Sequence, residues 1–411
     1  MKRKLIAVLL IILVRINPQG ANEALRWNTI NPYGSARAYA MGGAISAIGP
    51  DWINVCINPA GLSFLDNSYS IFSTYFLYKN SNASYLNISN TGVSANYNLF
   101  NNAGIAGIWN AGGSFTRAGV AIGYSRLDHY FTTVNISGKN TQYSILDDFI
   151  QKLKDDNVAS PSEILNSPKY LTNIKLAWET YLIDTVKDGS GIYSFKDTIP
   201  INDLTQNLSI STKGNRGEWS FSIYGLINDA VAIGATIGIP VLTFYSSSVY
   251  EEILNNTAGT NLRRFKWQRD LSTTAWGIQT RFGTMFKAGE NLRAGLYLQA
   301  PTILFLEDNF NAHIEASFAD NTYRSSAVND KNGLKKNYSY IGAFSGGIQL
   351  GLTFPPYLNA GIDYTIIPNN TGAFSSGDNQ SISSYLTITH QIRAGLEVTF
   401  AEMYSIRAGY T

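Results

Sequence analysis

Cysteine and charged residues are both scarce in this chain. Its 411 residues include one cysteine, Cys56, and charged residues make up 15% of the total, against about 25% in an ordinary soluble protein. A single cysteine excludes an internal disulfide, and we interpret Cys56 as a small buried hydrophobic residue. The net charge of +2 gives no reason to expect a nucleic-acid partner.

Metal-binding and catalytic motifs are also missing. His129, His313 and His390 are scattered, without the spacing that a zinc or iron site requires. The chain has no nucleophile elbow, phosphate-binding loop or paired-cysteine motif. We therefore expect no cofactor, no metal and no enzymatic activity. A serine paired with one of the histidines, as in barrel lipases and deacylases, is the enzymatic alternative that the sequence leaves open.

Long apolar runs are absent beyond the N-terminus. The mean hydropathy is −0.07, and no later stretch approaches the roughly 20 apolar residues of a membrane-spanning helix. Aromatic residues nevertheless make up 13% of the chain, with 25 tyrosines and 36 glycines. Such a composition is typical of alternating strands, because each strand has one apolar and one polar face.

Residues 1–21 have the features of a secretory signal peptide. Three basic residues precede an apolar stretch, Leu5–Val14, which is too short to span a bilayer. Ala21 is small enough to precede a cleavage site, and we expect the mature chain to begin between Asn22 and Leu25. A retained N-terminal anchor is the alternative.

The segment Gly34–Leu65 is rich in small residues, which allow close approach of other chain segments. Its glycines are Gly34, Gly42, Gly43, Gly49 and Gly61. In the run Asn58-Pro59-Ala60-Gly61-Leu62, Pro59 removes a backbone donor and Gly61 permits a positive φ. The run therefore predicts a rigid turn that presents the Asn58 amide. We expect the remaining chain to pack against this segment.

Period-two alternation recurs from Ser68 onward. Trp219, Phe221 and Ile223 share one face of a strand, and Glu218 lies on the other. A soluble sandwich would bury the apolar face, whereas a membrane barrel would turn it to lipid. The second face is rich in glycine and polar residues, which favours a crowded lumen. Several segments also reach the roughly 9–11 residues that tilted membrane strands need.

We therefore predict a transmembrane antiparallel β-barrel with about thirteen strand segments in this chain. The segments are Ser68–Leu77, Thr91–Phe100, Ser114–Leu127, Phe131–Ser137, Leu208–Thr212 with Glu218–Asn228, Val231–Tyr245, Phe265–Phe286, Leu292–Ile303, Asn309–Phe318, Tyr338–Thr353, Leu358–Ile367, Tyr385–Phe400 and Met403–Thr411.

Residues 140–206 interrupt this β pattern. Leu146, Phe149 and Leu153 recur at helical spacing, and Ser160 followed by Pro161 is a typical helix start. Membrane barrels keep their periplasmic turns short and place long insertions outside. We predict that 140–206 is a small helical extracellular cap.

The order of these motifs resembles a known family. A Met-Gly-Gly-Ala run, an acidic turn and Asn58-Pro59-Ala60-Gly61-Leu62, followed by many amphipathic strands, are similar to the FadL-type outer-membrane transporters of long-chain fatty acids and other hydrophobic compounds. The resemblance covers Gly34–Thr411, and only the motif around Asn58-Pro59-Ala60 is specific to the family. It implies that residues 22–66 form an N-terminal hatch that plugs a barrel formed by 67–411.

The resemblance also implies a strand count and a gate. The family's barrel has about 14 strands, so the last strand is expected to be missing here. The hatch would be the gate, and its residues are Asn58, Pro59, Ala60, Gly42, Gly43 and Gly61. Ligand in this family escapes sideways near the third strand, where Gly112 and Gly113 could make an opening in the wall. A plain turn is the alternative for these two glycines.

Ligand contacts are expected in the cap and the lumen. Trp178, Tyr181 and Leu182 could form a first apolar contact surface, or else the core of a helical hairpin. Arg293 and Arg393 could hold a carboxylate head group, or else pair with hatch acids such as Asp51.

We predict a bacterial outer-membrane transporter that takes up hydrophobic small molecules, long-chain fatty acids or hydrocarbons, by passive, ligand-gated diffusion through a monomeric barrel. Its partners would be the ligand and membrane lipid. The alternative is a barrel of the same architecture that binds protein partners, similar to the PorV-type secretion shuttles. A soluble secreted β protein is the third possibility.

Overall fold

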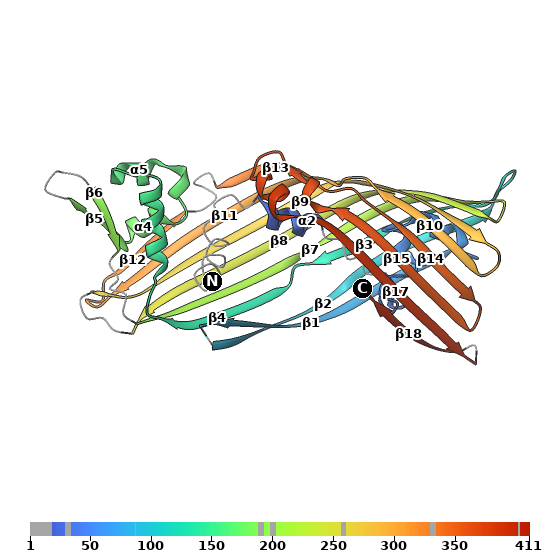
Figure 1. Ribbon diagram of the computed structural model, residues 1–411, viewed down its shortest axis with the longest axis horizontal. Coiled ribbons are helices and arrows are strands. Elements are labelled where there is room, and N and C mark those ends of the chain that lie inside the picture. The colour runs from blue at the N-terminus through green and yellow to red at the C-terminus, as the bar shows by residue number, and fades with distance from the viewer. Residues whose placement is uncertain are drawn as a thin grey trace.

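Long antiparallel strands dominate the computed structural model of the protein (Figure 1). It describes residues 19–28, 34–86, 88–187, 193–197, 203–255, 260–328, 334–401 and 403–411. Sixteen strands of these ranges form one sheet, which confirms the predicted antiparallel β architecture. The predicted signal peptide lies outside the described residues, apart from 19–21.

The main path of the sheet runs through eleven consecutive neighbours. These are β1 (Tyr69–Tyr85), β2 (Ile88–Asn110), β3 (Phe115–His129), β7 (Leu204–Ile227), β8 (Val231–Leu254), β9 (Leu262–Ala288), β10 (Leu292–Gln299), β14 (Ser345–Phe354), β15 (Leu358–Pro368), β17 (Ile388–Phe400) and β18 (Tyr404–Tyr410). Beside this path, β4 (Thr132–Asn140) pairs with β7, β11 (Ile303–Phe318) pairs with β9, β12 (Tyr323–Val328) and β13 (Lys335–Ile341), and β16 (Ala373–Phe374) pairs with β13.

The helices are short and lie outside this pairing. They are α2 (Ala21–Asn28), α3 (Ala36–Ala40), η1 (Trp52–Val55), η2 (Pro59–Phe64), α4 (Ile145–Asp155), α5 (Pro161–Asn166), η3 (Pro168–Tyr170), α6 (Ile174–Glu179), η5 (Asn369–Thr371) and α7 (Asn379–Tyr385). Among the described residues, no helix has the length and apolar character needed to cross a membrane.

The sheet exposes its apolar face and buries its polar face, which is the opposite of a soluble protein. On β7, the Ile223 side chain is 65% exposed, and Trp219 and Phe221 are exposed beside it. The alternating residues Glu218 and Ser220 are almost completely buried. A soluble sandwich would bury the apolar set, so this arrangement excludes it and is what a strand between lipid and a polar lumen requires.

Two of the predicted strand segments are divided differently in the structure. The interrupted segment Leu208–Asn228 is the single strand β7, and the segment Tyr338–Thr353 is two strands, β13 and β14. The division between β13 and β14 mirrors the division between their partners, β10 and β11. Pro301, which has no N–H, separates β10 from β11. Because β13 pairs with β11 and β14 pairs with β10, the chain must interrupt its pairing between them as well.

The insertion predicted to be helical is only partly so. The helices α4, α5 and α6 are present, but β4 extends to Asn140 and β7 begins at Leu204. Between the helices and β7 lies a two-stranded hairpin, β5 (Ile183–Lys187) and β6 (Tyr193–Asp197). Figure 1 shows α4, α5 and this hairpin together at one end of the long strands. We keep the name cap for residues 140–203.

Candidate functional site: a hatch inside the sheet

Within the predicted hatch, residues 22–66, the helix α2 forms one part, and residues 34–65, for which we keep the name hatch, form a chain of short capped turns. Ser35 caps α3 by accepting a hydrogen bond from the Ala38 N–H at 3.1 Å, and the Asp51 carboxylate caps η1 by accepting from the Ile53 N–H at 3.0 Å. Gly42 and Gly43 connect the turns with φ angles of +63° and +81°, which side chains disfavour. Nearly all hatch residues after Met41 are buried.

Asn58 is one of the residues that bind the hatch to the wall. Its Oδ1 accepts from the Ala60 N–H at 3.1 Å and caps η2. Its Nδ2 donates to Gln349 Oε1 at 2.8 Å, and the carbonyls of Leu296 and Thr284 lie at 3.3 and 3.4 Å. The side chain is completely buried, so all of its hydrogen bonds are made with protein.

Eight wall glycines form what we call the hatch seat, because a side chain at any of them would collide with the hatch. They are Gly104, Gly123, Gly234, Gly283, Gly351, Gly361, Gly395 and Gly409. A Cβ at Gly283 would overlap Asn58 Oδ1, and one at Gly234 would lie 2.6 Å from the Ala60 nitrogen. Glycine weakens a strand interior, and here it allows the wall to meet the hatch backbone directly.

The seat glycines are paired across the strands. Gly351 pairs with Gly361, which pairs with Gly395, which in turn pairs with Gly409. The Gly104–Gly123 and Gly234–Gly283 pairs form two further flat areas, under Trp52 and Pro59 respectively. The glycine-rich inner face is visible in the sequence, but this alignment is not, because strand register cannot be read from composition.

Two polar contacts join the hatch to different strands of the wall. Arg37 donates two hydrogen bonds to the Glu397 carboxylate of β17, at 2.8 and 2.9 Å, and Arg407 donates a third. Trp52 Nε1 donates to Ser125 Oγ of β3 at 2.7 Å. A bidentate guanidinium–carboxylate pair fixes orientation as well as distance, so α3 is held to β17 and β18.

The two arginines expected in the lumen are both there, but neither pairs with Asp51. Arg293 donates to the Ile48 carbonyl at 3.1 Å and lies over the Phe64 ring at 4.2 Å, so it belongs to the hatch contact. Arg393 donates to Gln391 Oε1 at 2.8 Å. Asp51 instead accepts hydrogen bonds from Ser35, which corrects the expected ion pair.

The cap residues expected to meet ligand are not brought together as one surface. Leu182 is fully buried in the apolar core beneath the cap, so it cannot be a contact surface in this conformation. Trp178 packs partly buried against the same core and against Phe195, with 6.5 Å between the ring centroids. Tyr181 is exposed and stacks under Arg324.

Gly112 and Gly113 occupy the turn between β2 and β3. A side chain at either would meet nothing within 4 Å, and Gly113 has a φ of +71°. The adjoining ladder is continuous from Asn110–Arg117 to Asn102–Ser125, so these glycines connect the strands in a plain turn.

The helix α2 fills the inside of the sheet between hatch and cap. Trp27 contacts Tyr130 and Phe244 edge to face, with centroid distances of 5.9 and 6.0 Å. Tyr340 donates to Asn28 Oδ1 at 2.9 Å. This helix was not predicted from the sequence, because the expected signal cleavage site lies within its residues.

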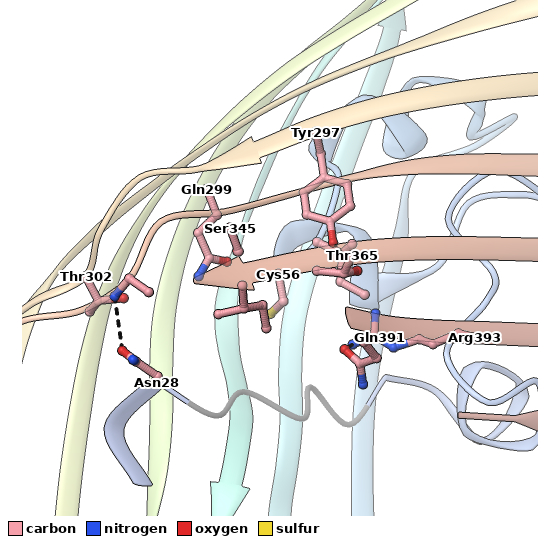
Figure 2. A pocket seen from close by; sticks show the side chains of 12 residues that line it. Asn28, Cys56, Tyr297, Gln299, Thr302, Ser345, Thr365, Gln391 and Arg393 are labelled. Atoms are coloured by element: carbon pink, nitrogen blue, oxygen red, sulfur yellow. Dashed lines mark hydrogen bonds between the residues drawn. The ribbon is translucent and has the colours of Figure 1, made fainter. Parts of the chain in front are cut away.

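A cavity separates α2 from the hatch (Figure 2). It is partly open, and its volume of about 40 Å³ is room for a few water molecules. We call it the lumen chamber, and its lining residues are Asn28, Cys56, Ile57, Tyr297, Gln299, Thr302, Ala343, Ser345, Thr365, Ile367, Gln391 and Arg393. Of the predicted site residues, only Arg393 lines it.

Comparison with known proteins gives structural similarity only. No family model and no curated protein matches the chain. Among solved structures, the toluene transporter TodX of Pseudomonas putida is similar at 14% identity and a TM-score of 0.44, over 92% of this chain and 83% of TodX. The CymD monoaromatic hydrocarbon channel is 11% identical with a TM-score of 0.44, over 91% of this chain and 81% of CymD.

The toluene transporter TbuX of Ralstonia pickettii is similar at 13% identity and a TM-score of 0.41, over 93% of this chain and 86% of TbuX. At such identities the likeness concerns the general layout of the chain.

Proposed function

We propose that the protein is an outer-membrane transporter that takes up hydrophobic small molecules, long-chain fatty acids or hydrocarbons, by passive diffusion through a barrel plugged by the hatch. The observation that carries this proposal is the hatch itself, which fills the inside of a sheet whose outer face is apolar. A molecule that passes through must move the hatch or go around it. Differential binding to the moved state would supply the gating.

The reversed polarity of the sheet supports the membrane location. Along β9 the exposed residues Trp276, Ile278, Phe282 and Phe286 form an outward stripe. Its length matches the roughly 9–11 residues that cross the hydrocarbon core as a tilted strand. Beyond this stripe, Arg263 and Arg264 are exposed on the same strand near the cap, which suits the side that faces water.

The route past the hatch is proposed to lead sideways through the wall, next to Trp52 and not at Gly112 and Gly113. The β2–β3 ladder stops at the Asn102–Ser125 pair, and Ser125 is the residue to which Trp52 is bonded. Just beyond it, Arg126 donates to the Phe100 carbonyl with its side chain. A hatch movement that releases Trp52 would therefore act directly on the end of this ladder.

The test of transport is uptake of radiolabelled oleate and toluene by cells that express the full-length protein. We expect the double variant Asn58→Ala, Pro59→Ala to lose uptake, since it removes the hydrogen bonds that seat the hatch, while Gly112→Ala leaves uptake unchanged. Uptake that is equal to that of empty cells for every form would overturn the proposal. If neither probe is taken up, and deletion of the cap releases a bound protein, the results would favour the alternative function, a barrel that binds protein partners.

The test of the exit is a disulfide between Asn101→Cys and Arg126→Cys, the next positions on the two strands. Closing the ladder there should reduce uptake, and a reducing agent should restore it. Unchanged uptake in the oxidised form would place the exit elsewhere.

A further inference from the structure

A second cavity lies on the outer face of the wall, near the cap. Its volume is about 290 Å³, close to the lower end of the roughly 300–1,000 Å³ of small-molecule pockets. We call it the wall recess. Three adjacent strands, β8, β9 and β11, supply its lining residues, which are Val249, Glu251, Arg264, Lys266, Glu315 and Ser317.

The recess faces away from the lumen. On β9, Lys266 lies between Phe265 and Trp267, whose side chains are buried in the apolar core beneath the cap. Alternate residues of a strand share one face, and the pairing of β9 with β11 has no irregularity between Trp276 and Lys266. Lys266 therefore lies on the same face as the exposed Trp276 of the apolar stripe.

The recess also lies beyond the part of the wall that meets the acyl chains. Trp276 is at the cap end of the apolar stripe, where tryptophan marks a membrane interface. Lys266 is ten residues further along β9, which corresponds to roughly 23 Å of height at a rise of about 3.3 Å and a tilt of about 45°. The outward residues between them are all polar, namely Gln268, Asp270, Ser272 and Thr274. This height is that of the saccharides carried by outer-leaflet glycolipids.

Acidic and basic side chains alternate across the recess. Glu251 pairs with Lys266 across the strands, and Lys266 pairs with Glu315. Arg264 Nη1 lies 3.7 Å from Glu251 Oε1, and His313 Nδ1 lies 3.5 Å from Glu315 Oε1. Among the described residues, the Lys266 ammonium has no ion pair within 4.0 Å. The recess thus offers donors and acceptors with no net charge.

This mixture is unsuited to several kinds of ligand. A hydrocarbon would remove water from four charged groups without replacing its hydrogen bonds. A phosphate would be repelled by the carboxylates on either side of Lys266, and a divalent cation by Lys266 itself. A neutral molecule with many hydroxyl groups suits the recess, because each hydroxyl can donate to a carboxylate and accept from an ammonium or guanidinium group.

An aromatic ring lies at the edge of the recess. Tyr323 of β12 is the cross-strand partner of Ser317, and its side chain is 57% exposed. The strand β12 is next to the cap (Figure 1). A tyrosine ring presents an apolar surface together with a polar tip, and the C–H face of a sugar ring can lie against such a surface. The ring and the charged groups together match the chemistry of a saccharide.

We propose that the wall recess binds a saccharide, with hydroxyl groups between Lys266 and the two glutamates and a sugar ring against Tyr323. Two sources carry this chemistry: the glycolipid of the outer leaflet, which surrounds the barrel at this height, and free polysaccharide. The inference goes beyond the proposed function. It uses the membrane location of the barrel and not its transport.

The test is binding of the core oligosaccharide that mild acid releases from lipopolysaccharide, measured by calorimetry on the purified full-length protein in detergent. We expect saturable binding that Lys266→Met weakens at least about 10-fold, because hydrogen bonds to charged groups are among the stronger ones. The matched control is Lys213→Met, which removes a lysine from the outward face of β7 and should leave binding unchanged. Both side chains lie outside the core, so the thermal unfolding temperature should stay near that of the wild type.

A second variant separates a saccharide from an anion. Glu315→Gln removes a charged acceptor, so it should weaken oligosaccharide binding, whereas loss of a neighbouring negative charge would strengthen the binding of phosphate. Three results would overturn the inference: no saturable binding, equal binding by Lys266→Met and the wild type, or tighter binding by Glu315→Gln. Displacement of the oligosaccharide by inorganic phosphate would overturn it as well.

Competition with whole lipopolysaccharide identifies the source of the saccharide. Displacement by lipopolysaccharide but not by lipid A, which lacks the core saccharide, would assign the site to the membrane glycolipid. If lipopolysaccharide does not displace the oligosaccharide, the site is one for free polysaccharide. Uptake of oleate and toluene should be equal in Lys266→Met and the wild type, so this inference and the proposed function fail or hold separately.

Discussion

The hatch and the cap both fill the inside of the same sheet, but different contacts hold them. The hatch meets the wall through backbone atoms that lie against glycines, and through Asn58. The cap meets it through large apolar side chains, such as Phe149 of α4, whose ring lies 5.4 Å from that of Trp267 on β9. The hatch contact depends on wall positions that have no side chain, whereas the cap contact depends on large side chains.

This difference predicts how each region tolerates change. A side-chain contact can repack when one methylene group is lost or gained, since rotamers adjust. A backbone contact has no rotamer to adjust, so an added methyl group must move the strand or the hatch. We therefore expect the hatch seat to be intolerant of single substitutions and the cap core to be forgiving.

The largest effect is expected at the buried ion pair beside the hatch. Arg281 and Glu218 are both fully buried and joined by two hydrogen bonds. Arg281→Met would leave the Glu218 carboxylate buried without its partner, and we expect a loss of about 3–5 kcal/mol in the free energy of unfolding. The measurement is guanidinium unfolding in micelles. Adding Glu218→Gln should recover part of the loss, and a loss below about 1 kcal/mol would contradict this account.

One methyl group should be costly at the hatch seat. Gly283→Ala places a Cβ where Asn58 Oδ1 lies, and we expect about 3 kcal/mol of destabilisation together with faster proteolysis of the hatch. The matched control is Gly112→Ala, where the added group meets nothing within 4 Å and the change should stay within about 0.5 kcal/mol. Equal effects at the two glycines would refute the hatch seat.

One methyl group should matter less in the cap. Ile174 is fully buried in the apolar cluster there, and Ile174→Val should cost about 1 kcal/mol by the same unfolding measurement. A cost as large as that of Gly283→Ala would erase the proposed contrast between the two regions.

The smallest effect should be a pH dependence confined to the cap. The Lys169 ammonium and the Tyr170 hydroxyl both donate to Asp156, and the hydrogen bond from Lys169 is the main reason why the pKa of Asp156 lies below its ordinary value of 3.8. A lowered pKa contributes stability above the ordinary value, and this stability is lost as the pH falls through the lowered one.

The protection of α4 and α5 amides, relative to their intrinsic exchange rate at each pH, should therefore fall below about pH 4, by an amount that corresponds to a few tenths of a kcal/mol because the pair is partly exposed. The hatch amides should not follow this pH dependence. In Asp156→Asn the dependence should disappear, and its persistence would assign it to another group.

Several parts of the structure could be predicted from local pattern. The alternation of Trp219, Phe221 and Ile223 with polar residues is a property of neighbouring positions, so it correctly indicated strands. A turn at Asn58 and Pro59 was predictable for the same reason, whereas the side-chain cap that Asn58 forms was not predicted, and Gly61 does not adopt the positive φ that the motif allows. The cap helices followed from helical spacing, whereas the hairpin β5–β6 had no comparable signal.

The amino-acid sequence by itself determined the strand character, the position of the capped turn in the hatch and the interruption at 140–206, because each depends on residues close together in the chain. Only the tertiary structure decided which glycines form the hatch seat, that α2 fills the space above it, and that Arg393 rather than Arg293 faces the lumen chamber. These features depend on strand register across hundreds of residues. A shift of one residue exchanges the two faces of a strand, so composition alone could not assign them.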